Sequence, residues 1–162
     1  MLSENMNNIL NEQIQAEFQA SYLYLAMSSY CEELNLPGFG GWLRAQGEEE
    51  RVHALRLLDF LLSREGQVEL REIERPPSGF GSAQEMFQAV LEHEQKVTTR
   101  IDEAYQAALE ERDNATAVEL QWFITEQVEE EKTAADILAK LKMVRADTVA
   151  LLMVDQDMES GK

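Results

Sequence analysis

Apolar residues recur along most of the chain at spacings of three and four positions, which is the period of an α-helix. Proline and glycine interrupt this pattern at "NLPGFGG" (35–41) and at "ERPPSGFGS" (74–82). Ser3, Ser82 and Asn114 are the candidate N-caps of the first, third and fourth helical segments. The pattern predicts four long helices and a short fifth one, at about residues 4–34, 38–65, 83–111, 115–144 and 147–158.

The lengths of the connections indicate how these helices pack. Only a few residues separate the first helix from the second, and the third from the fourth, so each pair is expected to form an antiparallel hairpin. The link at about 66–82 is long enough to run along a bundle and rejoin it at the far end. The predicted fold is therefore all-α: a four-helix bundle with a long crossover between helices two and three and a short C-terminal fifth helix, forming a single domain over residues 1–162.

Each predicted helix carries an apolar stripe that is interrupted near its middle by a carboxylate, an amide or an imidazole. Glu50 follows Glu17 by 33 residues, and His53 stands three positions later. Gln127 follows Glu94 by the same 33 residues, and Glu130 again stands three positions later. A pseudo-twofold arrangement of the two hairpins would bring six groups together at the centre of the bundle: Glu17, Glu50, His53, Glu94, Gln127 and Glu130.

These polar residues predict a metal site. One glutamate on such a stripe is more often a solvated residue at its edge, but six groups at matched spacing are poorly explained in this way. Four carboxylates within a few ångströms would repel one another strongly unless cations neutralise them. Two divalent ions supply the four positive charges required, with Glu50 placed to bridge them. Oxygen ligands with one imidazole suit iron or manganese, and zinc remains an alternative.

Charge and cysteine content narrow the range of partners. The 162 residues include 31 Asp and Glu against 14 Lys and Arg, which gives a formal net charge of −17. This excess argues against binding to nucleic acid or to an anionic membrane, and it favours cations. The single cysteine, Cys31, allows neither an internal disulfide nor a multi-cysteine metal motif. Neither a signal-peptide pattern nor a bilayer-spanning apolar run is found, so we expect a cytoplasmic protein.

Four motifs together resemble those of the bacterial non-haem ferritins. They are "EEERVHA" at 48–54, Glu17 in "QIQAEFQASYLYLAMS", Glu94 in "LEHEQKV", and "WFITEQVEEEK" at 122–132. The resemblance covers nearly the whole chain. It implies the ferritin-like fold, a hollow shell of 24 identical subunits, and iron storage. It also implies ferroxidase activity, in which Fe(II) is oxidised by O₂ at a di-iron centre and the ferric mineral is kept inside the shell.

The resemblance also assigns individual residues. Glu17, Glu50 and His53 match the ligands of the first iron. Glu50 bridges to the second iron, which Glu94 and Glu130 complete. Gln127 matches a hydrogen-bonding group beside the oxygen-binding region. A third iron site, which shares Glu130, matches Glu49, Glu126 and Glu129. Tyr24 resembles a tyrosine that donates an electron or a hydrogen bond near the irons, and a packed aromatic is an equal alternative.

Some positions depart from related proteins. Bacterioferritins place a haem-ligating methionine directly after the bridging glutamate, where this chain has Arg51, so haem is not expected. Animal ferritins line a threefold channel with an acidic pair at the positions of Ala117 and Leu120, so Glu119 or another route is expected to admit iron. The apolar fifth helix, with "VALLMV" at 149–154, is expected to pack between subunits.

Two other functions are compatible with a metal-binding bundle. One is a di-iron oxygenase acting on an organic substrate, which would need a substrate pocket that the large residues of the stripes leave little room for. The other is a helical bundle with a purely structural metal or none. Trp122 is expected to be a packed aromatic, and His93, which falls one step off its stripe, a solvated side chain.

Overall fold

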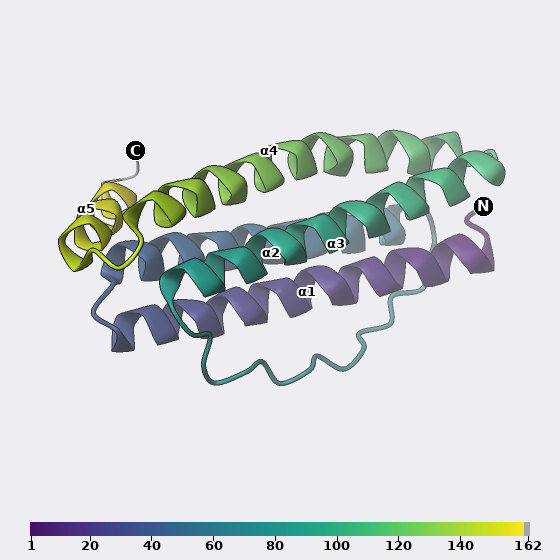
Figure 1. Ribbon diagram of the computed structural model, residues 1–162. Coiled ribbons are helices and arrows are strands. Elements are labelled where there is room, and N and C mark those ends of the chain that lie inside the picture. The colour runs from purple at the N-terminus through teal and green to yellow at the C-terminus, as the bar shows by residue number, and fades with distance from the viewer. Residues whose placement is uncertain (161–162) are drawn as a thin grey trace.

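The computed structural model describes residues 1–160, and five helices form its regular structure. They are α1 (Glu4–Glu33), α2 (Pro37–Ser63), α3 (Ala83–Glu110), α4 (Asn114–Val144) and α5 (Thr148–Glu159). The four long helices lie side by side, and α5 lies at the end of the bundle where α4 stops (Figure 1). The predicted all-α bundle with a long crossover is confirmed, and its predicted boundaries agree to within about two residues. Among residues 1–160, no helix has the length and apolar character needed to cross a bilayer.

Side-chain caps explain where three of the long helices begin. Ser3 accepts a hydrogen bond from the backbone N–H of Met6, and Ser82 forms a reciprocal capping box with Glu85. The prediction for α4 is wrong by one residue. Asn114 is the first residue of the helix, and Asp113 before it is the cap, because its carboxylate accepts from the backbone N–H of Thr116.

The core consists of two apolar clusters separated by a polar layer. One cluster, which includes Tyr24, Phe39 and Phe87, lies toward α5. The other includes Leu10, Leu57 and Phe123 and lies toward the opposite end of the bundle. Along each long helix the chain passes from one cluster to the other through buried polar residues. The polar layer is therefore held at mid-height by apolar packing on both sides.

The helix α5 is docked by a buried carboxylate. Leu36, at the start of α2, offers no side-chain cap, and the backbone N–H of Phe39 instead donates to Asp155 of α5 at 2.9 Å. Asp155 is buried. The close approach requires glycine at position 38, because a Cβ there would lie 1.7 Å from the backbone oxygen of Asp155. The capping interaction thus ties the C-terminal helix to the N-terminus of α2.

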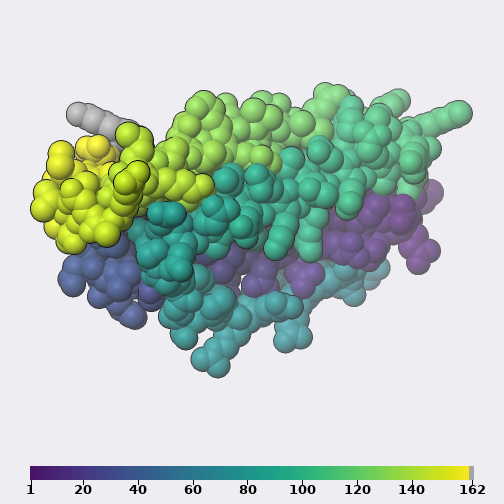
Figure 2. All heavy atoms as spheres, viewed as in Figure 1, coloured from purple at the N-terminus to yellow at the C-terminus, as the bar shows by residue number. Residues whose placement is uncertain are grey.

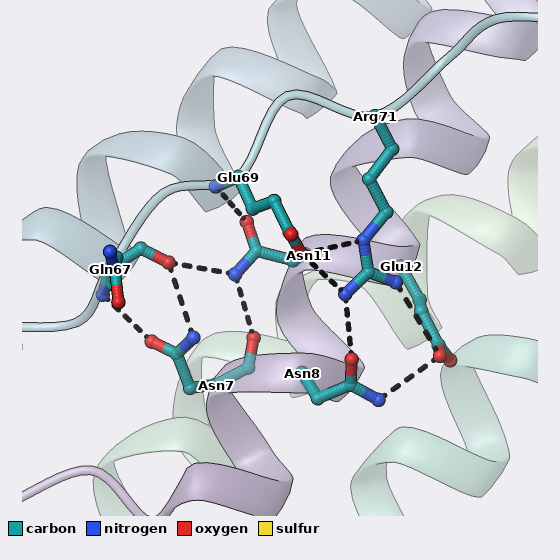
Figure 3. A network of polar contacts seen from close by, with 7 residues as sticks. All are labelled: Asn7, Asn8, Asn11, Glu12, Gln67, Glu69 and Arg71. Atoms are coloured by element: carbon teal, nitrogen blue, oxygen red, sulfur yellow. Dashed lines mark hydrogen bonds and ion pairs between the residues drawn. The ribbon is translucent and has the colours of Figure 1, made fainter.

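The crossover at 64–82 runs along the outside of α1 and forms a ridge on the molecular surface (Figures 1 and 2). It contains no regular secondary structure, so its backbone groups need other partners. Asn7 accepts from the N–H of Gln67 and donates to its carbonyl oxygen, and Asn11 donates to the same oxygen (Figure 3). Asn11 also accepts from the N–H of Glu69 at 2.7 Å. Beside these residues, Arg71 contacts Glu69, Asn8 and Glu12 (Figure 3).

The pattern continues along α1 at intervals of four residues. Gln15 donates to the carbonyl oxygen of Glu72, and Gln19 bonds both the N–H and the carbonyl of Glu74. Side-chain amides on one face of α1 therefore satisfy the backbone hydrogen-bonding groups of the extended crossover, as a neighbouring strand does in a sheet. This role was not predicted, although the four-residue spacing of amides in α1 is visible in the sequence.

Replacing Asn11 with alanine should lower the free energy of unfolding by about 1–3 kcal/mol, because buried amide bonds to the crossover are lost. The control is Gln106→Ala, which removes an exposed amide from α3 and should change the value by less than about 0.5 kcal/mol. Chemical denaturation followed by circular dichroism measures both. Equal effects of the two substitutions would contradict the role assigned to Asn11.

Candidate metal centre

The polar layer gathers side chains from all four long helices. Glu17 comes from α1, Glu50 and His53 from successive turns of α2, Glu94 from α3, and Gln127 and Glu130 from α4. Each of the six is no more than 9% exposed. The spacing of three residues between Glu50 and His53 puts both on the inner face of one helix. All six predicted residues are therefore buried in the same layer of the bundle.

The most compact group consists of Glu17, Glu50 and His53. Each offers one ligand atom, and these atoms lie within 4.8 Å of one another. The Nδ1 atom of His53 is 3.1 Å from Oε2 of Glu50 and 3.8 Å from Oε2 of Glu17. Gln13, one turn before Glu17, donates to its other carboxylate oxygen at 2.7 Å. Two acids and an imidazole from two helices thus face a common point.

One atom of this group has no partner. Oε2 of Glu17 is buried and accepts no hydrogen bond from any residue among 1–160. A buried carboxylate oxygen without a donor is costly, and a metal ion at the point it faces would satisfy it. The oxygen and nitrogen donors present are those that iron accepts. The unsatisfied buried oxygen and the types of donor atom present therefore both indicate that these residues can hold a metal cation.

Glu94 lies in the same layer but outside this compact group. It accepts a short hydrogen bond from the hydroxyl of Tyr24, which is fully buried. Gln127 donates to the Glu94 carboxylate at 3.2 Å, and also to its backbone oxygen. Both carboxylate oxygens of Glu94 are therefore engaged, and a metal ligand at this position would exchange one of these bonds for the metal.

A second group lies toward the gap between α2 and α4. Ligand atoms of His53, Glu126 and Glu130 lie within 4.8 Å of one another. Gln46, buried one turn before Glu50, donates a short hydrogen bond to Glu130. His53 belongs to both compact groups, so the two candidate positions for a cation share this imidazole.

An acidic cavity opens onto the second group. It has a volume of about 560 Å³ and lies between α2 and α4. Trp42, Trp122 and His53 form part of its wall. Its lining also includes five glutamates: Glu48, Glu49, Glu126, Glu129 and Glu130. Such a cluster of like charges in a concave surface attracts cations toward the buried layer.

Burial and the crowding of negative charge shift the pKa values of the side chains in the polar layer. Burial and the neighbouring carboxylates Glu94 and Glu49 raise the pKa of Glu130 to about 7. The pKa of Glu50 is raised well above its usual value by burial and by Glu17. Burial opposes protonation of His53, but the nearby carboxylates of Glu17 and Glu50 outweigh this and raise its pKa to about 10. The raised pKa values of Glu50, Glu130 and His53 favour protonation of these groups, so a cation binding here would compete with protons.

Comparisons with known proteins agree with this geometry. Residues 7–144 match the ferritin-like domain of the Ferritin family. This chain belongs to the ferritin family. It is 39% identical over 158 residues to a bacterial non-heme ferritin of Bacteroides fragilis (strain 638R), with 98% of each chain covered. It is 38% identical to a bacterial non-heme ferritin of Campylobacter jejuni, with 96% of this chain and 93% of the relative covered.

A solved structure shows the same fold. The open pore ferritin of the archaeon Archaeoglobus fulgidus is 45% identical and covers 98% of both chains, with a TM-score of 0.97. Membership of the ferritin family supports a role in iron storage, and the glutamate and histidine cluster is consistent with iron binding.

The remaining residues that the ferritin resemblance assigned differ in their placement. Glu126 lies in a compact group, whereas Glu49 and Glu129 are exposed and line the same cavity. The positions of the animal ferritin channel pair, Ala117 and Leu120, are both buried within the subunit. The carboxylate of Glu119, the alternative entry residue, forms a bidentate ion pair with Arg56, and a route through it stays a prediction.

Three contributors to the site were missed or misjudged. Gln13 stands four residues before Glu17, a spacing that could have marked it as a supporting amide. Gln46 donates across the bundle to Glu130, a contact that spacing within one helix does not reveal. His93 was expected to be solvated, but it is partly buried and packs edge to face on Tyr24 at 5.6 Å. The reason is that α3 lies against α1, so a residue one step off the central stripe still contacts the neighbouring helix.

The raised pKa values predict a stability profile for the metal-free protein. Groups whose pKa is raised on folding stabilise below their unfolded pKa, and this contribution is lost as pH rises through the folded value. For Glu130 the loss runs from 4.5 to about 7, and for His53 from 6.5 to about 10. The lowered pKa of Glu17 affects more acidic solutions, where its contribution falls. Burial lowers the pKa of His93, which gives the opposite slope below 6.5. The melting temperature without metal should therefore fall as pH is raised from about 5.5 to 9, most steeply above about 6.5.

Calorimetry on metal-stripped protein measures this slope. Glu130→Gln should flatten the part below about pH 7, whereas Glu129→Gln, which removes the same charge from an exposed neighbour, should leave it unchanged. Added Zn(II), which binds the deprotonated ligands, should reverse the sign of the slope. A melting temperature that rises with pH in the stripped protein would contradict the assigned protonation.

Proposed function

We propose that the protein is an iron-storage ferritin with ferroxidase activity. Each subunit oxidises Fe(II) with O₂ at a di-iron centre in the polar layer, and 24 subunits enclose the ferric mineral. The observation that carries the proposal is the buried group of Glu17, Glu50 and His53 with its unsatisfied carboxylate oxygen. A carboxylate-rich site in an apolar interior is stable only with cations, and iron is the substrate that the family stores.

In this proposal the carboxylates supply both the ligands and the driving force. Two Fe(II) ions each give one electron to O₂, and with two protons the products are two Fe(III) ions and hydrogen peroxide. Negative ligands stabilise Fe(III) more than Fe(II), so the layer favours the oxidised product. Glu17 and His53 hold the first iron, Glu50 bridges, and Glu94 and Glu130 hold the second.

Neighbouring groups complete the proposed site. Gln127, which donates to Glu94, orients that carboxylate and lies beside the position of O₂. Tyr24 also donates to Glu94, so the carboxylate can accept the phenolic proton if the ring gives up an electron. Glu49, Glu126 and Glu129 form the third iron site, with Glu130 shared.

The acidic cavity between α2 and α4 provides the proposed route for iron. It reaches from exposed Glu49 and Glu129 to buried Glu130 and His53. A lining with five carboxylates also favours a cation over the organic substrate that a di-iron oxygenase would need. The route replaces the channel that Ala117 and Leu120 leave without acids.

Exposed apolar residues on α5 support assembly. Val149, Leu152 and Met153 each expose nearly half or more of their surface, which is unusual for a short helix on a lone subunit. We propose that this face packs against other subunits of the shell. A single domain and a cytoplasmic location, as expected from the sequence, are parts of the same proposal.

The central test compares Glu50→Gln with Glu92→Gln. Loss of the bridging charge should slow Fe(II) oxidation, followed by stopped-flow absorbance in air, by at least about tenfold. Glu92 is exposed on α3, and its substitution should leave the rate unchanged. Both variants should elute in gel filtration at about 24 times the 18.5 kDa of one chain. A full oxidation rate in Glu50→Gln, or a wild-type protein that elutes as a monomer or dimer, would overturn the proposal.

A second test concerns the iron route. The combined substitution Glu49→Gln, Glu126→Gln and Glu129→Gln removes charge from the cavity but leaves the Glu17, Glu50 and His53 group intact. At low ionic strength and low Fe(II), uptake should slow by about tenfold, and the difference should shrink as salt screens the charges. The matched control replaces three exposed glutamates elsewhere, Glu4, Glu72 and Glu110. An equal effect in the control would show that only total charge matters.

A further inference from the structure

Trp122 forms part of the wall of the candidate centre. Its ring packs edge to face on His53, with 5.4 Å between the ring centroids, and on Phe123 at 4.9 Å. It also lines the acidic cavity. An indole in this position is exposed to whatever oxidants iron chemistry releases, and tryptophan is among the most easily oxidised side chains.

The other contact on Trp122 is a cation. The guanidinium carbon of Arg56 lies 4.0 Å from the centroid of the Trp122 ring. Glu119 fixes this guanidinium through two hydrogen bonds, from Nε at 2.5 Å and from Nη2 at 3.2 Å. The carboxylate is the less exposed partner of the ion pair. Glu119, which is not one of the candidate metal ligands, thus holds Arg56 in place over the indole.

A positive charge over an aromatic face has a definite effect on oxidation. It attracts the electron-rich neutral ring and repels the radical cation that forms when the ring loses an electron. Removing an electron from Trp122 is therefore harder with Arg56 in place. We propose that Arg56 is a positioning residue that protects Trp122 from one-electron oxidation beside the centre. The protective role rests on the proposed ferroxidase function, whereas the effect of the cation on the ring does not.

The oxidising step balances with species that the proposed reaction supplies. Hydrogen peroxide from O₂ reduction takes one electron from a further Fe(II) and gives Fe(III), hydroxide and a hydroxyl radical. The hydroxyl radical takes one electron from the indole and becomes hydroxide, while the indole nitrogen loses its proton to water. The resulting neutral indole radical adds O₂ to give a peroxyl radical, which takes one electron from a further Fe(II) and one proton from water. The hydroperoxide so formed rearranges to N-formylkynurenine, which is heavier than tryptophan by two oxygen atoms.

The second tryptophan, Trp42, is an internal control for Trp122. Trp42 lines the same cavity and is also partly buried, but it packs on Phe87 at 5.5 Å. Within residues 1–160, the cations that lie over aromatic rings are Arg56, over Trp122 and Phe123, and Arg64, over Phe60. Trp42 therefore faces the same solvent and the same acidic surroundings without a cation on its ring.

The first experiment uses iron-free protein. Light-generated tris(bipyridine)ruthenium(III) removes single electrons from tryptophan and returns to ruthenium(II). Trp42 and Trp122 fall on different tryptic peptides, so mass spectrometry gives the ratio of their oxidation in one sample. The variant Arg56→Gln combined with Glu119→Gln removes the cation and its partner together, so the net charge that attracts the reagent is unchanged.

The ratio of Trp122 to Trp42 oxidation should rise about three- to tenfold in this neutral pair variant. Arg56→Lys, which retains a positive charge, should keep the ratio closer to wild type. If the neutral pair unfolds locally, Arg56→Gln alone removes the cation, and it should raise the ratio where Arg56→Lys does not. An unchanged ratio in the folded neutral pair, or an equal rise in Arg56→Lys, would overturn the proposal.

The second experiment repeats the mass measurement after cycles of Fe(II) addition in air. Oxygenated Trp122 should accumulate in the neutral pair variant several times faster than in wild type, while Trp42 is unchanged. A raised ratio with ruthenium but intact Trp122 after iron turnover would overturn the protective role. If wild-type protein fails to oxidise iron, the proposed function falls, and the ruthenium ratio still reports whether Arg56 shields the ring.

Discussion

The structure depends on the burial of like charges in one layer of an otherwise apolar core. Glu17, Glu50, Glu94 and Glu130 converge from four helices, and their mutual repulsion opposes the packing of those helices. The two apolar clusters on either side of the layer supply the burial that holds the helices in register despite this repulsion. Without metal, protons reduce the repulsion, as the raised pKa values of Glu50 and Glu130 indicate. Apolar packing and protonation therefore both offset the repulsion in this layer, and a bound cation would offset it further.

Amide side chains recur at two places in the structure, and they have a different role at each. Inside the bundle, Gln13 donates to Glu17 and Gln46 to Glu130, so these two acids each have a neutral partner that fixes the carboxylate without cancelling its charge. On the outside, Asn11 and its neighbours along α1 satisfy the backbone of the crossover. The crossover must be long because its two ends lie at opposite ends of the bundle (Figure 1). A long segment without regular structure is stable only if its backbone groups find such partners.

The sequence predicted the helices and the composition of the polar layer because both follow from local rules. A helical period fixes which residues share a face, so the spacing of Glu50 and His53 was enough to place them together. The pairing of side chains could not be predicted in the same way. Whether Glu94 meets Tyr24 or a metal, and whether Glu119 is free or bound to Arg56, depends on the rotation and separation of neighbouring helices. The shift of the α4 cap from Asn114 to Asp113 is a smaller case, since either residue type can cap a helix.

Tyr24 and Trp122, which both contact residues of the polar layer, face opposite electrostatic partners, and this difference has a chemical consequence. Tyr24 donates its hydroxyl proton to Glu94, a base that can accept the proton when the ring loses an electron. Trp122 has a guanidinium over its face, which opposes the positive charge that electron loss creates. In a site that reduces O₂ by single-electron steps, a tyrosine that is oxidised and then reduced again can supply an electron. Oxidation of a tryptophan that lines the cavity would instead modify that side chain permanently. Under the proposed function, these contacts would favour electron loss from Tyr24 on α1 over electron loss from Trp122 in the cavity through which iron is proposed to enter.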